Sequence, residues 1–381
     1  MIRRLIRTVL SPAAVARLRG TRDRMRVGML RVCSRSPLLS TLYYLFASRA
    51  FRREHQAVLY GRLKHEEDNL SAAQSLYRLR RNVHRLEKGL IMRPRRPVFA
   101  VEYIEETVHS LAARLGANGN GANGSGDAGP LLDACVPAVP GDPQEVRWAR
   151  DVLDAYFEAA SGHPAIERAR SRFQALPRIP VEEGPPVAPY RRDLSQAPPV
   201  AYDDLLRLSI RRRSVRWFEP RPVPRELIDR AVQVAAQSPS ACNRQPFEFR
   251  VFDDPDLARQ VAGIPMGTRG FDHNFPVVVA VVGRLRAYFD EKDRHVIYID
   301  GGLASMSFVL ALETLGLASC CINWPDVEQQ ERAMASLLGL EPDERVIMLI
   351  ALGWPDADAL VPASGKKALD VVRRYNARGQ G

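Results

Sequence analysis

The sequence holds few cysteines, and none of them follows a metal-binding pattern. Its 381 residues include five cysteines, an odd number, with no CxxC motif and no zinc-ligand spacing to histidine. This pattern predicts reduced thiols, a cytoplasmic protein and no structural metal. The sequence also lacks a Ser/His/Asp or Cys/His arrangement, so no catalytic side chain is assigned. That absence does not exclude an enzyme whose cofactor carries the chemistry.

Acidic residues are nearly absent from the beginning of the chain. Residues 1–65 contain 15 Lys and Arg but two Asp and Glu, a local charge of +13 within a total of +11, so the rest of the chain carries −2. A short cationic helix, which Pro12 would end, is predicted there from apolar residues that share one face: Ile2, Leu5, Ile6, Val9 and Leu10. Such a helix can lie on an anionic membrane surface.

Long hydrophobic runs are missing as well. The apolar stretch at residues 38–47 is roughly half of what a membrane span requires. No small-residue cleavage site follows the first helix, which argues against a secretory signal. The basic segment therefore packs on the protein, touches the inner face of a membrane as a peripheral contact, or binds nucleic acid. No RNP, zinc or helix-turn-helix motif supports the last option, so no nucleic acid is expected.

The remainder of the first half reads mainly as helices and loops. One helix is predicted from apolar residues at three- and four-residue spacing: Leu76, Leu79, Val83, Leu86 and Leu90. In that helix His84 has no companion at ligand spacing, so a surface role is favoured over a catalytic one. The low-complexity residues 116–130 predict a disordered loop. Asp142 predicts a helix N-cap, followed by Pro143 in the first turn and Glu145 in a capping box.

A proline-rich connector precedes the second half. Seven prolines lie between residues 177 and 199. We therefore divide the chain into a basic, mostly helical region at residues 1–192 and a second domain at residues 193–381. In the second domain, β-rich runs predict strands at 247–252, 277–283 and 345–353, of which the last two are apolar enough to be central.

Two helices are predicted in the second domain. Pro224 can open one whose apolar stripe ends before Ser238: Leu227, Ile228, Ala231, Val232 and Ala235. Residues 301–317 are apolar on nearly all sides, which predicts a buried helix.

Two polar segments flank the helix after Pro224. The first, RRRSVRWF at residues 211–218, is a cluster of guanidinium groups with one hydroxyl. The second, SPSACNRQP at residues 238–246, offers backbone amides and two amide side chains. Arginine binds phosphate oxygens bidentately, and amide side chains can bind the edge of a heterocycle. The pattern fits a phosphorylated, hydrogen-bonding ligand, and a solvated charged face is the alternative.

These segments, with the helix PRELIDRAVQVAAQ between them, resemble the opening of the FMN-dependent nitroreductase family, which also includes iodotyrosine deiodinases and flavin-cleaving enzymes. The resemblance runs from residue 202 to the end. It implies an α+β, nitroreductase-like fold with a central mixed, mainly antiparallel sheet flanked by helices. It also implies an interlocked homodimer with FMN between the subunits. The first half lies outside the resemblance.

The resemblance extends to individual cofactor-binding residues. The family's RRSxR stretch, which contacts the phosphate, ribityl chain and pyrimidine edge, is matched by Arg212, Arg213, Ser214 and Arg216. The family's loop from the partner subunit is matched by Pro239, Ser240, Ala241, Asn243 and Gln245. A turn over the isoalloxazine is matched by a segment that includes Ser319 and Cys320. Lys366 stands where an arginine often closes on the phosphate, and a lysine loses the bidentate geometry.

Cys242 and Arg244 depart from the family pattern. The resemblance implies an oxidoreductase that passes hydride from NADH or NADPH through FMN to a small organic acceptor by a ping-pong mechanism. Two alternatives stay open. One is an FMN enzyme of another reaction type, such as dehalogenation, dehydrogenation or flavin cleavage. The other is a non-catalytic flavin-binding protein at the membrane surface.

Overall fold

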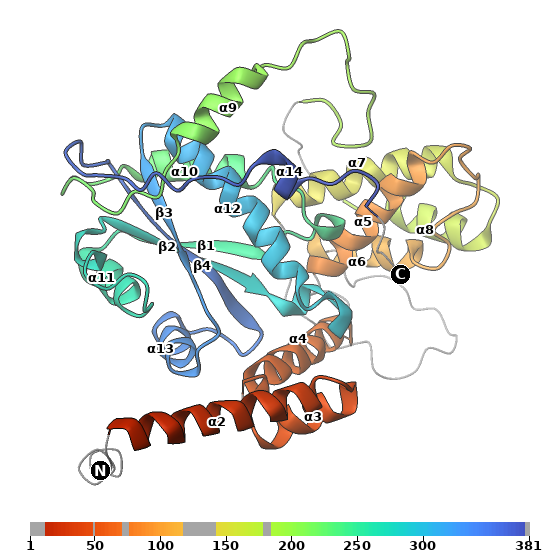
Figure 1. Cartoon of the computed structure of the whole chain (residues 1–381). Helices are drawn as coiled ribbons and strands as arrows, with labels where there is room; N and C mark the ends of the chain where they lie inside the picture. Colours follow the sequence, from red (N-terminus) through yellow and green to blue (C-terminus); the bar gives the residue numbers. More distant parts are fainter. Residues whose placement is uncertain (1–11, 49, 71–75, 117–141, 178–183, 378–381) are drawn as a thin grey trace. The chain divides into compact units, whose positions relative to one another are not determined.

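The computed structural model describes residues 12–48, 50–70, 76–116, 142–177 and 184–377 (Figure 1). The helix predicted at residues 2–10 and nearly all of the loop predicted at 116–130 lie outside this part of the chain. The chain divides into two compact units, residues 1–57 and residues 58–381. The domain boundary proposed at residue 193 stays a prediction.

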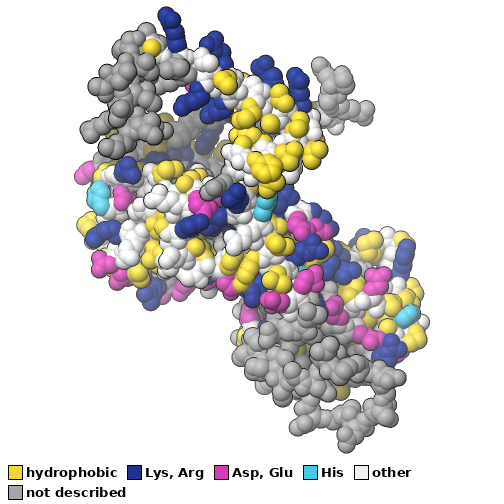
Figure 2. All heavy atoms as spheres, turned by 90° about the horizontal axis from the view of Figure 1, so that it is seen from below, with side chains coloured by type: hydrophobic (Ala, Val, Ile, Leu, Met, Phe, Trp, Pro, Cys, Tyr) yellow, Lys and Arg dark blue, Asp and Glu magenta, His cyan; other side chains and the backbone are white. Residues whose placement is uncertain are grey.

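The first unit contains two helices, α2 (Pro12–Cys33) and α3 (Pro37–Phe46). Helix α4 (Arg52–Leu70) begins in this unit and continues into the second. Pro12, which was expected to end a helix, begins α2, where its missing N–H costs nothing. No residue of α3 is buried. Figure 2 shows hydrophobic side chains gathered over this part of the chain, with Lys and Arg side chains around them.

The second unit opens with helices that share one apolar core: α5 (Leu76–Leu90), α6 (Ile104–Arg114), α7 (Pro143–Ala159) and α8 (Pro164–Gln174). Helix α5 confirms the predicted apolar stripe, since Leu79, Val83 and Leu86 are fully buried. Helix α7 begins as predicted, with the Asp142 carboxylate accepting from the Gln144 amide at 3.0 Å. The predicted capping role of Glu145 is wrong, because this carboxylate is buried and lies 3.5 Å from Arg80 instead.

Four strands form the sheet, in the order β1 (Phe247–Phe252), β2 (Val277–Arg284), β4 (Glu344–Gly353) and β3 (Ala318–Asn323). All neighbours are antiparallel, and a parallel bridge joins Ser214 to Ser319 at the β3 edge. The predicted strands are confirmed, and β2 and β4 are central as expected. Ser319 and Cys320, which the resemblance assigned to a turn, lie in the edge strand β3 instead.

Helices cover both faces of the sheet (Figure 1). Helices α10 (Arg225–Ala235) and α12 (Val296–Thr314) pack on the face that bears Val277, Val279 and Val281. Helices α11 (Pro255–Gly263) and α13 (Glu328–Leu338) pack on the opposite face, against the alternate residues of the same strand. This is an α+β architecture with a helical region before it.

Helix α12 is less enclosed than its composition predicts. Phe308 and Leu312 lie in the core, but an apolar stripe of Ile299, Leu303 and Met306 stays 44–52% exposed. Within the described residues, this helix is long and apolar enough to cross a membrane, but half of its apolar 18-residue stretch is buried inside the protein.

The remaining helices are short or exposed. Helix α9 (Tyr202–Arg211) has no buried residue and precedes the arginine segment. The described chain also contains α14 and four short 3₁₀ turns: Leu369–Val372, Ala241–Asn243, Asp272–Asn274, Leu285–Ala287 and Glu291–Asp293.

Candidate functional site

The arginine segment lies along the edge of the sheet. After α9 ends, Val215 N donates to Ser319 O at 3.0 Å beside the Ser214–Ser319 bridge. A second bridge joins Phe218 to Pro355. Gly353 permits this approach, because a Cβ there would lie 3.0 Å from the Phe218 ring and 2.5 Å from Pro276. Residues 214–218 are therefore held in an extended conformation beside β3 and the end of β4.

Asn274 fixes the same segment from its other side. Its side-chain Nδ2 donates to Arg216 O at 2.9 Å, and its Oδ1 accepts from Phe218 N at 3.0 Å. One amide thus satisfies both backbone groups that flank Trp217. No local pattern in the sequence indicated this role for Asn274.

The guanidinium groups of this segment differ in how they are partnered. Arg211 pairs with Glu313 at 2.8 Å. Among the described residues, no carboxylate lies within ion-pair distance of Arg212, Arg213 or Arg216. Arg213 donates only to the carbonyl of Arg212, at 3.0 Å, and Arg216 to that of Ser214, at 3.4 Å. Three half-buried cations without carboxylate partners fit a phosphate group.

Ser319 and Cys320 lie on β3 beside the arginine segment, and both are buried. Burial raises the pKa of the Cys320 thiol, although Arg216 and a hydrogen bond with Ser214 oppose the shift. The thiol form therefore persists at neutral pH, which argues against a reactive thiolate at this position.

The amide loop adopts a strained backbone. Cys242, Asn243 and Gln245 have positive φ angles of 53°, 51° and 48°. Residues other than glycine adopt this left-handed region only at an energetic cost. Ser240 Oγ accepts from Gln245 N at 3.0 Å, and Gln245 Nε2 donates to Asn243 Oδ1 at 2.9 Å. The polar groups of the loop therefore hold one another in place.

A buried carboxylate from α12 supports the loop. Both oxygens of Asp300 lie 3.2 Å from the Ala241 amide, and one accepts from the Tyr288 hydroxyl at 2.5 Å. Burial raises the pKa of Asp300, and these hydrogen bonds oppose the shift. The pKa of Tyr288 is raised by burial and by Asp300. Asp300 was missed, although a carboxylate in an apolar helix was a signal.

A second support comes from the helical region. Arg80 Nε on α5 donates to Asn243 O at 2.8 Å. The Arg80 guanidinium also stacks on Trp148 at 5.3 Å and lies 3.5 Å from Glu145. Burial raises the pKa of Glu145, and Arg80 opposes that shift. Nothing in the sequence indicated that α5 would reach the loop.

The structure places the two motifs at opposite ends of α12. Ala241 is bonded near the beginning, at Asp300, and Arg211 near the end, at Glu313. Between these residues the helix rises about 20 Å. The residues within each motif are therefore close together, but within one copy of the chain the arginine segment and the amide loop are far apart. Lys366 is exposed on the segment after β4 and joins neither group.

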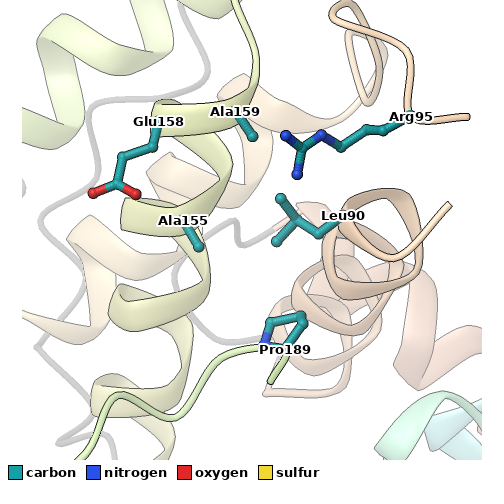
Figure 3. Close-up of a pocket in the computed structure, with 6 residues that line it drawn as sticks. All are labelled: Leu90, Arg95, Ala155, Glu158, Ala159 and Pro189. Carbon is teal, nitrogen blue, oxygen red and sulfur yellow. The ribbon is translucent and has the colours of Figure 1, made fainter. Parts of the chain in front are cut away.

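A surface pocket of about 390 Å³ lies elsewhere, in the helical region and its connector. Figure 3 shows Leu90, Ala155, Ala159 and Pro189 around it, with Arg95 extending toward it and Glu158 pointing away. None of the proposed cofactor residues lines this pocket.

The site therefore belongs to an α+β domain that carries an arginine segment and an amide loop at the two ends of one long helix. The nitroreductase family model matches residues 210–268 and 258–354. The C-terminal half of the chain contains a nitroreductase-family domain, and the N-terminal region is unassigned.

The curated relatives named here share about a quarter of their residues with the matched part of this chain. The chain is 24% identical over 190 residues to iodotyrosine deiodinase 1 of Pongo abelii, which covers 42% of this chain and 65% of the relative. It is 27% identical over 154 residues to an Archaeoglobus fulgidus protein provisionally named NADH dehydrogenase/NAD(P)H nitroreductase. That match covers 40% of this chain and 86% of the relative. The chain thus spans slightly less than two thirds of the deiodinase.

Solved structures of similar fold include an FMN-dependent nitroreductase from Clostridium difficile R20291, with 21% identity and a TM-score of 0.38 over 45% of this chain and 98% of that one. A nitroreductase family protein from Streptococcus pneumoniae TIGR4 has 21% identity and a TM-score of 0.39, over 45% of this chain and 99% of that one.

Proposed function

We propose that the protein is an FMN-dependent oxidoreductase that takes hydride from NADH or NADPH and passes it to a small organic acceptor in a ping-pong cycle. The observation that carries this proposal is a set of three arginines, held at the β3 edge inside a nitroreductase-family domain, that have no carboxylate partner in the described part of the chain. Their neighbour Arg211 is already paired. The chain therefore keeps its unpaired cations where the family motif expects the FMN phosphate.

Each group of residues then has a defined task. Arg212, Arg213 and Ser214 would hold the phosphate, and Arg216 would face the pyrimidine edge. FMN, when bound, supplies the hydride chemistry. The amide loop, fixed by Asp300, would present the remaining hydrogen-bonding atoms of the Asn243 and Gln245 side chains without having to reorganise, which is the condition for electrostatic stabilisation.

A homodimer would bring the two motifs together. The exposed stripe of Ile299, Leu303 and Met306 runs along α12 between them. If two copies paired through this stripe in antiparallel fashion, the amide loop of one would approach the arginine segment of the other. A two-fold axis makes both contacts at once, giving two equivalent sites.

A second candidate function is supported by the curated relatives. Several of them carry the name iodotyrosine deiodinase, and the match to the nitroreductase family model includes residues 211–218. Reductive dehalogenation would use the same flavin site with a halogenated aromatic acceptor. A flavin-binding protein without turnover is the remaining alternative.

One spectroscopic experiment separates these functions. The purified protein is recorded in the visible range, and NADH and then NADPH are added without oxygen. Loss of the flavin absorbance supports the reductase and identifies its donor. A yellow protein that neither nucleotide reduces, but that dehalogenates iodotyrosine after dithionite reduction, favours the deiodinase. A colourless protein that takes up no added FMN would rule out both.

We further propose that the first unit makes a peripheral contact with the inner, cytoplasmic face of a membrane. Helix α3 has no buried residue and exposes Leu38, Leu42 and Phe46. The basic charge of residues 1–65 complements anionic lipid. Co-sedimentation with anionic vesicles, lost on Leu42→Glu or in neutral vesicles, would support this contact. Equal binding to both vesicles, or none, would contradict it.

A further inference from the structure

Helix α5 contributes more than a support for the amide loop. The Arg80 bond to Asn243 O places this helix against the loop. The next residue, Arg81, lies near two residues of the loop, Cys242 and Arg244. Arg81 and Arg85 are one helical turn apart and share a face.

Aromatic rings order the guanidinium groups around the loop. Arg81 lies over Phe289 at 4.8 Å, and Arg85 lies over Tyr103 at 3.7 Å. Arg244, which ends the loop, lies over Tyr288 at 4.8 Å. Because Tyr288 and Phe289 are consecutive, Arg81 and Arg244 stack on neighbouring rings. Stacking fixes the orientation of each planar group and leaves its edge available to an oxygen acceptor.

This cluster is short of negative charge. Among the described residues, no carboxylate lies within ion-pair distance of Arg81, Arg85 or Arg244. Glu106 influences Arg81, but it already accepts from Arg78 at 2.7 Å and Asn82 at 3.1 Å. Burial lowers the pKa of Arg81, and the nearby charges of Arg85 and Arg244 lower it further. An added anion would offset the repulsion among these like charges.

The three arginines have different access to a ligand. Arg244 is only 4% exposed, so it cannot contact a ligand at the surface and contributes only its positive charge to the local electrostatic potential. Arg81 and Arg85 are half-buried and can contact a ligand at the surface. The FMN phosphate is not the expected occupant, because in the proposed dimer Arg212 and Arg213 of the other copy are assigned to it.

We propose that Arg81 and Arg85 form a subsite for the anionic group, a carboxylate or phosphate, of the electron acceptor. This inference rests on the proposed function, since it places the subsite beside the loop that would meet the flavin. The helical region outside the family match thereby selects acidic acceptors over neutral ones. Arg81 and Arg85 are specificity-determining residues and take no part in hydride transfer.

The test compares three acceptors that differ mainly in charge: 4-nitrobenzoate, 4-nitrophenyl phosphate and the neutral 4-nitrobenzamide. The FMN-loaded full chain is compared with the Arg81→Gln/Arg85→Gln variant. Arg332→Gln is the control, because it removes an exposed positive charge of α13 that pairs with Glu328. Calorimetry measures the dissociation constant of 4-nitrobenzoate, and steady-state kinetics gives kcat/KM for each acceptor.

The double variant should weaken 4-nitrobenzoate binding about tenfold or more, as loss of charge-assisted hydrogen bonds does. It should lower the ratio of kcat/KM for 4-nitrobenzoate to that for 4-nitrobenzamide by a similar factor, and Arg332→Gln should not. The response of the two anionic acceptors shows whether the subsite prefers carboxylate or phosphate.

Three results would overturn the inference: an unchanged ratio, an equal loss for charged and neutral acceptors, or a raised KM for NADPH alone, which would assign the arginines to the donor. If the wild type turns over 4-nitrobenzamide, the proposed function stands in each of these cases. If it takes up no FMN, both proposals fail.

Discussion

The arginine segment and the amide loop use their polar groups in opposite ways. Arg212, Arg213 and Arg216 have no carboxylate partner among the described residues, although their backbone is held by β3 and Asn274. The loop at residues 239–245 is bonded internally, to Asp300 and to Arg80. One motif is a fixed backbone with unpaired charges, and the other is a strained backbone held by buried partners.

The difference indicates what each motif contributes to stability. Unpaired surface cations add little to the folded state and repel one another, so their removal should affect ligand binding and leave folding intact. The partners of a strained loop offset the cost of its conformation, so their removal should destabilise the fold first. The predictions below test this contrast.

The largest effect is expected at the arginine segment. The double variant Arg212→Gln/Arg213→Gln should weaken FMN binding at least about 100-fold, because each charge-assisted hydrogen bond contributes about 1.5–3 kcal/mol. Fluorescence titration of the apoprotein with FMN measures this change. Urea denaturation of the same apoprotein should stay within about 0.5 kcal/mol of wild type. Unchanged FMN affinity, or a fold lost together with binding, would remove the contrast.

Asp300→Ala should have the reverse profile. It leaves the Tyr288 hydroxyl and the Ala241 amide without their acceptor, and each buried unsatisfied group costs about 1–3 kcal/mol. We expect the free energy of unfolding of the apoprotein to fall by about 3 kcal/mol, measured by urea denaturation at fixed protein concentration. Asp300→Asn keeps one acceptor oxygen and should cost less. An Asp300→Ala protein as stable as wild type would show that the loop needs no anchor.

A smaller effect is expected for Arg80→Lys. Lysine keeps a positive charge near Glu145 but cannot reproduce the Nε bond to Asn243 O and the stacking on Trp148 together. The apoprotein should lose about 1 kcal/mol of stability, the value of one hydrogen bond. Arg78→Lys, two residues earlier on α5, is the matched control, because Arg78 pairs with Glu106 away from the loop. Equal losses in the two variants would deny Arg80 a specific role.

Much of the sheet domain follows from local patterns. The run at residues 247–252 coincides with β1, and the two apolar runs are the central strands, because side-chain alternation and burial depend on neighbours in the sequence. The N-cap at Asp142 is equally local. Such features need no knowledge of distant residues.

The supports of the loop could not be predicted in the same way. Arg80 and Asn243 are 163 residues apart, and nothing in either local pattern points to the other. Glu145 was assigned to a capping box because that motif is local, whereas a long-range partner, Arg80, binds it instead. Strand β3 was missed because the family resemblance assigned Ser319 and Cys320 to a turn, although β3 has the same length as the other edge strand, β1, which was predicted. Long-range pairing determined the outcomes for Arg80 and Glu145.

The smallest effect is expected at Arg211, which lies beside the unpaired arginines but is itself paired. Its ion pair joins an exposed guanidinium to the Glu313 carboxylate, whose side chain is only 11% exposed, and should contribute about 0.5 kcal/mol to stability. Arg211→Gln alone leaves the Glu313 carboxylate uncompensated near the phosphate arginines, so FMN binding should weaken slightly, and added salt should reduce the difference. Arg211→Gln/Glu313→Gln removes both charges and should restore wild-type affinity in the same fluorescence titration. If the double variant instead binds FMN as poorly as Arg212→Gln/Arg213→Gln, Arg211 contacts the phosphate directly, and the contrast between paired and unpaired arginines fails.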